Sequence, residues 1–451
     1  MASIIKRGKT YSVVYSYKEE GKRKQKWETF PNEKEAKKRK AEIEYKQSED
    51  IFIAPSGETV RELIKDYISL YGEKKWTVNT YDSNMSLIDN YILPFLGDMK
   101  LQDITPRAAD IYVTKLLKSR SMKKCAEPCN VSVRTAEKTV KLLKSAFRQA
   151  VRYGLVAKNP FEQALLPKAE YHKRDIWTKE DIEKALDACT DDKLYIAMNL
   201  AFACSMRIGE ILGLTWKDVH ISEEDIMSDN AYVYIRQELT RASENAIKHL
   251  DERNVYFIFP PIMSCPSTRL ILKKPKTDSS IRKVWLPKTL AYILREWKGK
   301  QERLKEILGE EYYGYDLVCC LPNGRPCDQR SIAKSFEKLK KKAELPNVVF
   351  HSLRHSSTTY KLKLNHGDLK ATQGDTGHAE IDMITKIYAH ILDEDRKTNA
   401  QRFEDAFYGG KQLKDVRPPE RKDGEDVENL IKKIRDNPEI ADMLIKLLNK
   451  G

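Results

Sequence analysis

Two breaks in the hydrophobic pattern divide this chain into segments that cannot share one core. The first is IFIAPSGET, around residue 55, and the second is AKNPFEQALLPKAEYHKRDIW at residues 157–177, where Pro160 and Pro167 stop helices. A third break, RPPERKDGED, follows residue 408. A chain of 451 residues is also too long for one ordinary core. We therefore expect four parts, at residues 1–55, 58–166, 175–408 and 409–451.

The first part has the pattern of a small sheet with one helix. Residues 10–17 alternate as a half-buried strand does, Gly21 lies in a turn, and residues 25–30 read as a second strand. A helix follows from the capping residue Asn32. Basic side chains surround the hairpin, namely Lys22, Arg23, Lys24 and Lys26. A ribbon of this width fits a DNA major groove, although a solvated basic hairpin has the same pattern.

Residues 58–166 read as entirely helical. Thr59 is placed to cap one helix, and Gly97 ends another. The helix at 133–154 has an apolar face made by Val140, Leu143, Phe147 and Val151. Its other face carries a basic stripe made by Lys141, Lys144, Arg148 and Arg152. Such a stripe either follows a phosphate backbone or is a solvated surface, and the pattern leaves both open.

Residues 175–408 mix helices with short strands. The strand candidates are residues 231–239, 269–287 and 347–350, which predict a small sheet inside a helical domain. The insertion between the first two, at about 241–268, has no assigned role. Beyond 408, the flexible break leads to an amphipathic tail whose apolar face needs a partner.

The charge balance favours a polyanionic partner. The chain carries 81 Lys and Arg against 67 Asp and Glu, a net charge of +14, which suits nucleic acid better than a small acidic substrate. The cysteines show no metal-ligand spacing, so we expect no metal. The N-terminus lacks the apolar stretch of a signal peptide, and no segment approaches 18 apolar residues. We therefore expect an intracellular protein with no membrane partner.

Four segments carry residues suited to chemistry on an anion. AFACSMRIGEIL places Arg207 at the start of a helix, with Glu210 one turn later to hold it. Lys276 lies in the turn of a predicted hairpin. His351 and Arg354 lie one helical turn apart, so both side chains point at the same anion. GDTGHAEIDMITKIYAHI brings His378 after a glycine and Tyr388 on the next helix. Taken singly, each residue is more often structural.

In this order, Arg, Lys, His-x-x-Arg, Gly-His and Tyr resemble the tyrosine recombinase family, the integrases of phages and conjugative transposons. The resemblance implies a multidomain, mainly α protein with small β-sheets. Its parts are an arm-binding domain with a three-stranded sheet plus helix, an all-helical core-binding domain and a mixed α+β catalytic domain. It makes Tyr388 the nucleophile, assisted by Arg207, Lys276, His351, Arg354 and His378. Cys204 and Ser205 depart from the usual Thr-Gly, and Thr376 replaces the common Leu.

The chemistry of this family calls for these residue types. Attack on a phosphodiester spreads negative charge over its oxygens, and arginines match those oxygens with a fork of donors that stays charged. A phenol with a pKa near 10 needs cationic surroundings and a proton acceptor, for which His351 is suited. Lys276 on its hairpin is the best donor for the leaving 5′ oxygen. No metal or other cofactor is expected, because no carboxylate cluster or phosphate-binding glycine loop is present.

The resemblance therefore implies a site-specific DNA recombinase that integrates and excises a mobile element through a 3′-phosphotyrosine intermediate. Its expected partners are double-stranded DNA at core and arm sites, three further copies in a homotetramer, and an excisionase. The expected location is the bacterial cytoplasm, with nucleoid association when bound. Two alternatives stay open: a type IB topoisomerase-like enzyme, and an inactive DNA-binding regulator with the same fold.

Overall fold

The computed structural model describes most of the chain up to Gly377. The described residues are 2–19, 22–49, 52–53, 55–122, 128–168, 176–250, 252, 254–261, 267–365, 368–377, 432 and 436. The chain divides into two units, Met1–Ile381 and Asp382–Gly451, and almost all of the described residues belong to the first. Within this described portion, no helix is long and apolar enough to cross a membrane.

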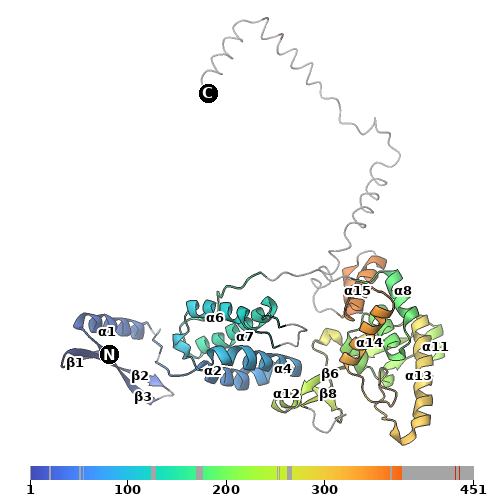
Figure 1. The fold of residues 1–451 in the computed structure, drawn as a ribbon, viewed down its shortest axis with the longest axis horizontal. Helices are drawn as coiled ribbons and strands as arrows, with labels where there is room; N and C mark the ends of the chain where they lie inside the picture. The colour runs from blue at the N-terminus through green and yellow to red at the C-terminus, as the bar shows by residue number, and fades with distance from the viewer. Residues whose placement is uncertain are drawn as a thin grey trace. The chain divides into compact units, whose positions relative to one another are not determined.

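The N-terminal part is an antiparallel sheet of three strands in the order β1-β2-β3, with α1 along one face (Figure 1). The elements are β1 Ala2–Arg7, β2 Thr10–Glu19, β3 Lys22–Phe30 and α1 Glu33–Ser48. The Asn32 side chain caps α1 by accepting from the Glu35 amide. Val13, Tyr15 and Ile43 form the core of this part. The predicted strands, helix and cap are confirmed.

The next part is built from helices, as predicted. They are α2 Val60–Tyr67, η1 Ile68–Gly72, α3 Glu73–Lys75, α4 Val78–Leu87, η2 Ile88–Ile92, α5 Leu93–Leu96, η3 Leu101–Asp103, α6 Pro106–Lys118 and α7 Val133–Arg152. Thr59 and Glu62 form a capping box at α2. The helices α6 and α7 pack side by side (Figure 1) around an apolar core that includes Leu143 and Phe147.

The largest part combines two small sheets with helices. Its sheets have the orders β4-β5-β9 and β6-β8-β7, all antiparallel. The strands are β4 Val219–His220, β5 Tyr232–Ile235, β6 Glu238–Ser243, β7 Val255–Ile258, β8 Thr268–Lys273 and β9 Arg282–Trp285. The helices are α8 Lys179–Ala188, α9 Asp192–Ala203, α10 Ile208–Gly213, η4 Trp216–Asp218, α11 Glu223–Met227, α12 Glu244–His249, η5 Asp278–Ser280, α13 Lys288–Leu308, η6 Gly309–Glu311, α14 Gln329–Lys342, α15 Ser352–Leu364 and α16 Leu369–Thr376. This mixed α+β composition agrees with the predicted fold class.

The strand predictions for this part were only partly right. The apolar run at 231–239 is broken, and its halves β5 and β6 pair in different sheets. The strand predicted at 347–350 is wrong, because this segment is a loop between α14 and α15. Val348 and Phe350 are nevertheless buried in the main core. A short apolar run such as residues 348–350 indicates burial, and periodicity alone does not say whether the run forms a strand.

The insertion at 241–268 has a definite place in the fold. It provides α12 and β7, and it packs against α4 of the helical part. Val78 and Tyr81 of α4 share an apolar cluster with Ala246 and Ile247 of α12. The insertion is therefore an apolar contact between two parts of the chain that are far apart in sequence.

Candidate active site

Arg207 and Glu210 form a buried ion pair at the start of α10. Arg207 is the N-cap residue, and its Nη1 donates to Glu210 Oε1 at 2.6 Å. Its backbone amide donates to Oε2 of the same carboxylate at 3.0 Å. Glu210 is 1% exposed, so a buried carboxylate holds the guanidinium of the partly exposed Arg207 in place. The predicted local arrangement is confirmed.

Arg354 is anchored even more deeply, on α15. It is 2% exposed and donates to two backbone carbonyls, those of Ser205 and Thr376, the second at 2.7 Å. Burial, together with the positive charge of Arg207, lowers the pKa of Arg354 to about 9. Two guanidinium groups that repel each other favour binding of an anion near them.

Ser205 explains one departure from the family pattern. Its φ is +51°, in the left-handed region where glycine is favoured, and Ser205 is fully buried. The carbonyl that this conformation exposes accepts from Arg354. A hydrogen bond of 2.6 Å between the hydroxyls of Ser205 and Ser357 stabilises the serine here. The left-handed backbone conformation at this position therefore accounts for the usual glycine, and in this chain a serine adopts that conformation.

Arg282 joins this group, and the sequence analysis missed it. Its Nη2 lies 3.2 Å from Glu210 Oε2, and its Nε donates to the carbonyl of Asp375 at 3.2 Å. Burial raises the pKa of Glu210, but Arg282 and Arg207 lower it more, so the net pKa is below the usual value. The available signal was register: Arg282 and Val284 share the buried face of β9, where an unpaired cation is rare.

Arg207, Arg282, Arg354 and Glu210 are called the arginine cluster below. Two of its arginines reach the turn that ends α16: Arg354 binds Thr376, and Arg207 Nη2 donates to the carbonyl of Gly377 at 3.1 Å. Gly377 has a φ of +64°. His378 and Tyr388 lie outside the described residues. The cluster is thus fixed to the backbone immediately before His378 in the sequence.

His351 is the residue just before α15. It has helical backbone angles and is partly exposed, while Arg354 on the following turn is buried. Its ring lies edge-on to that of His355, with 4.8 Å between the ring centroids. The predicted spacing of one helical turn between His351 and Arg354 is confirmed.

Lys276 differs from its three neighbouring lysines. Lys273 is 5% exposed and pairs with Glu238. Lys274 pairs with Asp278 at 3.0 Å, and Lys283 lies 3.7 Å from the ring centroids of Tyr232 and Trp285. Lys276 is exposed and lines an open cavity of about 730 Å³. Lys276 lies in the segment between β8 and β9, but the predicted hairpin is wrong, because β8 pairs with β6 and β7 whereas β9 pairs with β5.

This cavity also contains part of the basic stripe of α7. Lys138 and Lys141 line it together with Lys276, and Tyr67 and Trp76 supply aromatic surface. The rest of the stripe is engaged elsewhere. Lys144 and Arg148 both approach Glu162 Oε1, at 2.8 and 3.7 Å, and Arg152 stacks over Tyr153. The structure therefore separates the stripe into a cavity-lining end and a paired end.

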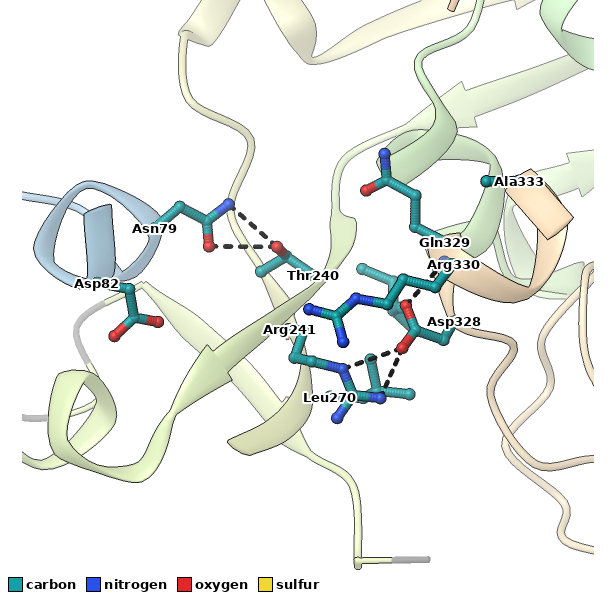
Figure 2. Close-up of a pocket in the computed structure, with 10 residues that line it drawn as sticks. Asn79, Asp82, Thr240, Arg241, Leu270, Asp328, Gln329, Arg330 and Ala333 are labelled. Atoms are coloured by element: carbon teal, nitrogen blue, oxygen red, sulfur yellow. Dashed lines mark hydrogen bonds and ion pairs between the residues drawn. The ribbon is translucent and has the colours of Figure 1, made fainter. Parts of the chain in front are cut away.

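A second cavity, of about 420 Å³, lies where β6 meets α4 and α14 (Figure 2). In Figure 2, Arg241 points at Asp328, to which it donates twice, at 2.7 and 3.0 Å. Asn79 of α4 hydrogen-bonds Thr240 at 3.0 Å. Arg241 and Asp328 are paired with each other, and Asp82 accepts from Ser243, so we assign these contacts a structural role.

The basic residues of the N-terminal sheet are split by the pleat. Arg23, Lys24 and Lys26 are exposed on β3, and the side chain of Lys22 is not among those described. Successive side chains alternate, so Arg23 shares the face of Trp27, away from α1, while Lys24 and Lys26 share that of Glu28, which binds Arg39 of α1. Arg7 stacks over Trp27 with 4.5 Å to the ring centroid. The sequence analysis missed this arginine–tryptophan pair.

The arginine cluster has the composition of a phosphate site. Two guanidinium groups pair with one carboxylate, and the third, of Arg354, interacts electrostatically with the same carboxylate. The cluster therefore has a net positive charge, and arginine matches phosphate oxygens in geometry. Among the described residues, no group of three or more His, Cys, Asp or Glu is placed to hold a metal ion. The residues present are suited to electrostatic stabilisation of a phosphate.

Two segments of the chain match known protein families. Residues 261–395 match the phage integrase family, and residues 59–117 match the N-terminal SAM-like domain of phage integrases. A tyrosine recombinase XerC-like protein of Caldanaerobacter subterraneus is 28% identical over 280 residues, which cover 59% of this chain and 65% of that protein, just under two thirds. The ICEBs1 integrase of Bacillus subtilis is 22% identical over 332 residues, covering 72% and 78% of the two chains.

Solved structures show the same fold. The Tn1549 transposon integrase, in complex with transposon right end DNA, has a TM-score of 0.59 at 19% identity, covering 76% of this chain and 99% of that one. Residues 75–356 of lambda integrase, as a dimer bound to a core site, give 0.50 at 18% identity, covering 73% and 95%. These values show a shared fold over 76% and 73% of this chain.

Proposed function

Since the chain belongs to the tyrosine recombinase family, we propose that it is a site-specific recombinase that cleaves and rejoins DNA through a bond between Tyr388 and a 3′ phosphate. The proposed reaction integrates and excises a mobile element inside a bacterial cell. Family membership supports this proposal, together with a site whose charge suits a phosphodiester.

The observation that carries the proposal is the anchoring of Arg207 and Arg354 around one backbone turn. Arg354 binds the carbonyl of Thr376, and Arg207 binds that of Gly377. Both carbonyls come just before the segment that leads to Tyr388. Donors that are fixed before the reaction need no reorganisation when charge develops on the phosphate oxygens. We assign these two arginines to the non-bridging oxygens, with His378 as a third donor.

Proton transfer is assigned to Lys276 and His351. Lys276 is exposed in the segment between β8 and β9, where a four-carbon side chain reaches a departing 5′ oxygen. His351 lies one helical turn from Arg354, beside the proposed phosphate position, and accepts the phenolic proton of Tyr388. The phosphotyrosine bond retains the energy needed for rejoining, so no cofactor is required by this scheme.

DNA binding is assigned to three surfaces. Core DNA would contact the cavity lined by Lys138, Lys141 and Lys276 and the remainder of the basic stripe. Arm DNA would contact the N-terminal sheet, where Arg7, Arg23 and Trp27 share an exposed face. A homotetramer on paired sites and an excisionase partner follow from the family assignment. We assign residues 1–55 to the arm sites, residues 58–166 to the core sites and residues 175–408 to catalysis.

The test is a covalent-adduct assay. Labelled suicide DNA with a nick near the cleavage point traps the 3′-phosphotyrosine, which denaturing gels detect as a slow band. Tyr388→Phe removes only the attacking oxygen, so it should bind the same DNA and form no adduct. An adduct that persists in Tyr388→Phe would contradict the assignment of the nucleophile, and no adduct with the parent protein on its core site would contradict the function.

Domain roles are tested by deletion. A fragment that lacks residues 1–55 should still bind and cleave the core site but lose protection of distant arm sites in footprinting. Loss of core binding with arm binding intact would reverse the assigned roles. Arg7→Ala is the matched point variant, because it removes the cation over Trp27 without touching the core of the sheet.

A further inference from the structure

Arg282 is a buried arginine of β9 to which the proposed mechanism gives no part. It is 8% exposed, and its guanidinium meets Glu210 through two nitrogens, at 3.3 Å for Nη1 and 3.2 Å for Nη2. It lies 72 residues from Glu210 in sequence, so tertiary structure alone brings the two together. A cation this deep needs a reason, because burial of an arginine that has no function normally costs stability.

The charge count around Glu210 supplies the reason. If Glu210 paired with Arg207 alone, the pair would be neutral, because the Glu210 carboxylate would compensate most of the charge of Arg207. Arg282 gives the carboxylate a second cation, so the trio keeps a charge of +1. Arg207 is the partly exposed member, and its side chain is 31% exposed against 6% for Arg282. The uncompensated charge therefore belongs to the arginine that is open to substrate.

Arg282 also links three chain segments of the site. It contacts Glu210 of α10, and its Nη1 donates to the carbonyl of Ser280, in the loop that follows Lys276. Its Nε donates to the carbonyl of Asp375 in α16. A Cβ on Gly377 would lie 2.9 Å from Arg282 Cδ and Nη1, so a larger residue would displace the Arg282 side chain, and the φ of +64° also favours glycine here. One side chain thus holds the Lys276 loop, the Arg207 pair and the turn before His378 together.

We propose that Arg282 is a positioning residue for strand cleavage, which compensates Glu210 so that Arg207 directs its charge at the scissile phosphate. This inference rests on the proposed function. It predicts that the effect of Arg282 passes through Arg207 and depends on the charge of the phosphate.

The first experiment compares two substrates. Arg282→Met keeps most of the side-chain volume and removes the charge. It should slow adduct formation on ordinary DNA by about 100-fold, as loss of a preorganised charge does. A methylphosphonate at the scissile position removes one negative charge, so the loss there should be less than about tenfold. Arg295→Met is the matched control, because Arg295 forms an arginine–glutamate pair with Glu223 on the surface. It should cleave like the parent.

The second experiment is a double-mutant cycle. If Arg282 acts through Arg207, then Arg207→Ala together with Arg282→Met should be no slower than Arg207→Ala alone, since residues acting as a unit are non-additive. Damage to the fold would instead multiply the two losses. Melting temperature and core-site affinity are measured for each variant, and Arg282→Lys, which keeps the charge, should recover at least about tenfold of the loss.

The outcomes separate this inference from the function. Absence of an adduct with the parent protein contradicts the proposed function. If the parent forms an adduct, three results contradict the role of charge. Arg282→Met loses the same factor in rate on both substrates, the losses in the double-mutant cycle multiply, or Arg282→Met cleaves at the parental rate. If Arg282→Met does not fold, the cleavage rate of Arg282→Lys is measured on ordinary and on methylphosphonate DNA instead. A loss of rate that is equal on the two substrates overturns the proposal.

Discussion

The arginine cluster and the basic stripe of α7 hold their cations in opposite ways. In the cluster, Arg282 and Arg354 are buried, and each guanidinium has defined partners on a carboxylate or a backbone carbonyl. On α7, Lys141, Arg148 and Arg152 are exposed along an amphipathic helix. Residues of one chemical type are thus placed for two tasks.

The two regions are expected to interact with DNA phosphates in different ways. Fixed, buried donors act on one phosphate and lose their effect when moved by a fraction of an ångström. Exposed cations act on many phosphates by releasing counterions, so each contributes a small, salt-dependent share. We therefore expect substitutions in the cluster to affect the cleavage rate, and substitutions in the stripe to affect affinity.

The largest effect is expected for Arg354→Ala. It removes a donor that we assign to the phosphate, together with the hydrogen bonds to the carbonyls of Ser205 and Thr376, so cleavage should fall by about 10³-fold or more. Arg148→Ala, an exposed arginine of the stripe, should change cleavage less than about twofold at low salt. Adduct rates at saturating DNA measure both. Similar losses for the two variants would remove the distinction between the regions.

Lys276 shares a property with each region, because it is exposed like the basic stripe and is assigned to catalysis like the arginine cluster. Lys276→Ala should lose about 100-fold or more of cleavage on ordinary DNA, where an alkoxide must leave. On DNA with a 5′ bridging sulfur, a thiolate of conjugate-acid pKa about 8.5 leaves without a donor, so the variant should cut nearly as fast as the parent. Arg207→Ala should not recover on the sulfur substrate, since its target oxygens are unchanged.

Lys283→Ala is the control for this experiment, because Lys283 is held over Tyr232 and Trp285 and should not act as the acid. Rescue of Lys274→Ala by sulfur, or inactivity of Lys276→Ala on the sulfur substrate with normal binding, would show that the proton donor is another residue.

A moderate effect is expected from the pH dependence of Glu210. Its folded pKa lies below the ordinary 4.5, since Arg282 and Arg207 together outweigh burial. The charged carboxylate therefore stabilises the fold above pH 4.5, and this contribution is lost as pH falls through the lower folded value. Glu210→Gln should show a smaller drop in urea midpoint between pH 7 and pH 3.5 than the parent. Parallel curves would mean that Glu210 does not couple to stability.

The smallest effect is expected within the stripe. Lys141 lines the cavity that contains Lys276, while Lys144 is already paired with Glu162. Lys141→Ala should reduce the salt slope of core binding by about one unit, and Lys144→Ala by less. Binding measured between low and moderate salt gives both slopes. Equal slopes in the two variants and the parent would make the stripe a solvated surface.

Sequence patterns predicted the features that depend on near neighbours. The capping residues Asn32 and Thr59 and the Arg207–Glu210 pair each depend on residues three positions apart, so spacing was sufficient. Arg282 has its partner 72 residues away, and no local period marks such a contact. The division of Lys276 from Lys273 also needed the structure, because the four lysines differ only in what surrounds them.

The order in which the chain is synthesised gives the α4–α12 contact a consequence for folding. Val78 and Tyr81 of α4 are made long before Ala246 and Ile247, which cover them. At roughly 5–20 residues per second, those apolar side chains stay uncovered on the ribosome for about ten seconds or more. The helical part therefore completes its surface only after the insertion emerges. Truncation before residue 250 should leave a nascent chain that recruits chaperones through α4.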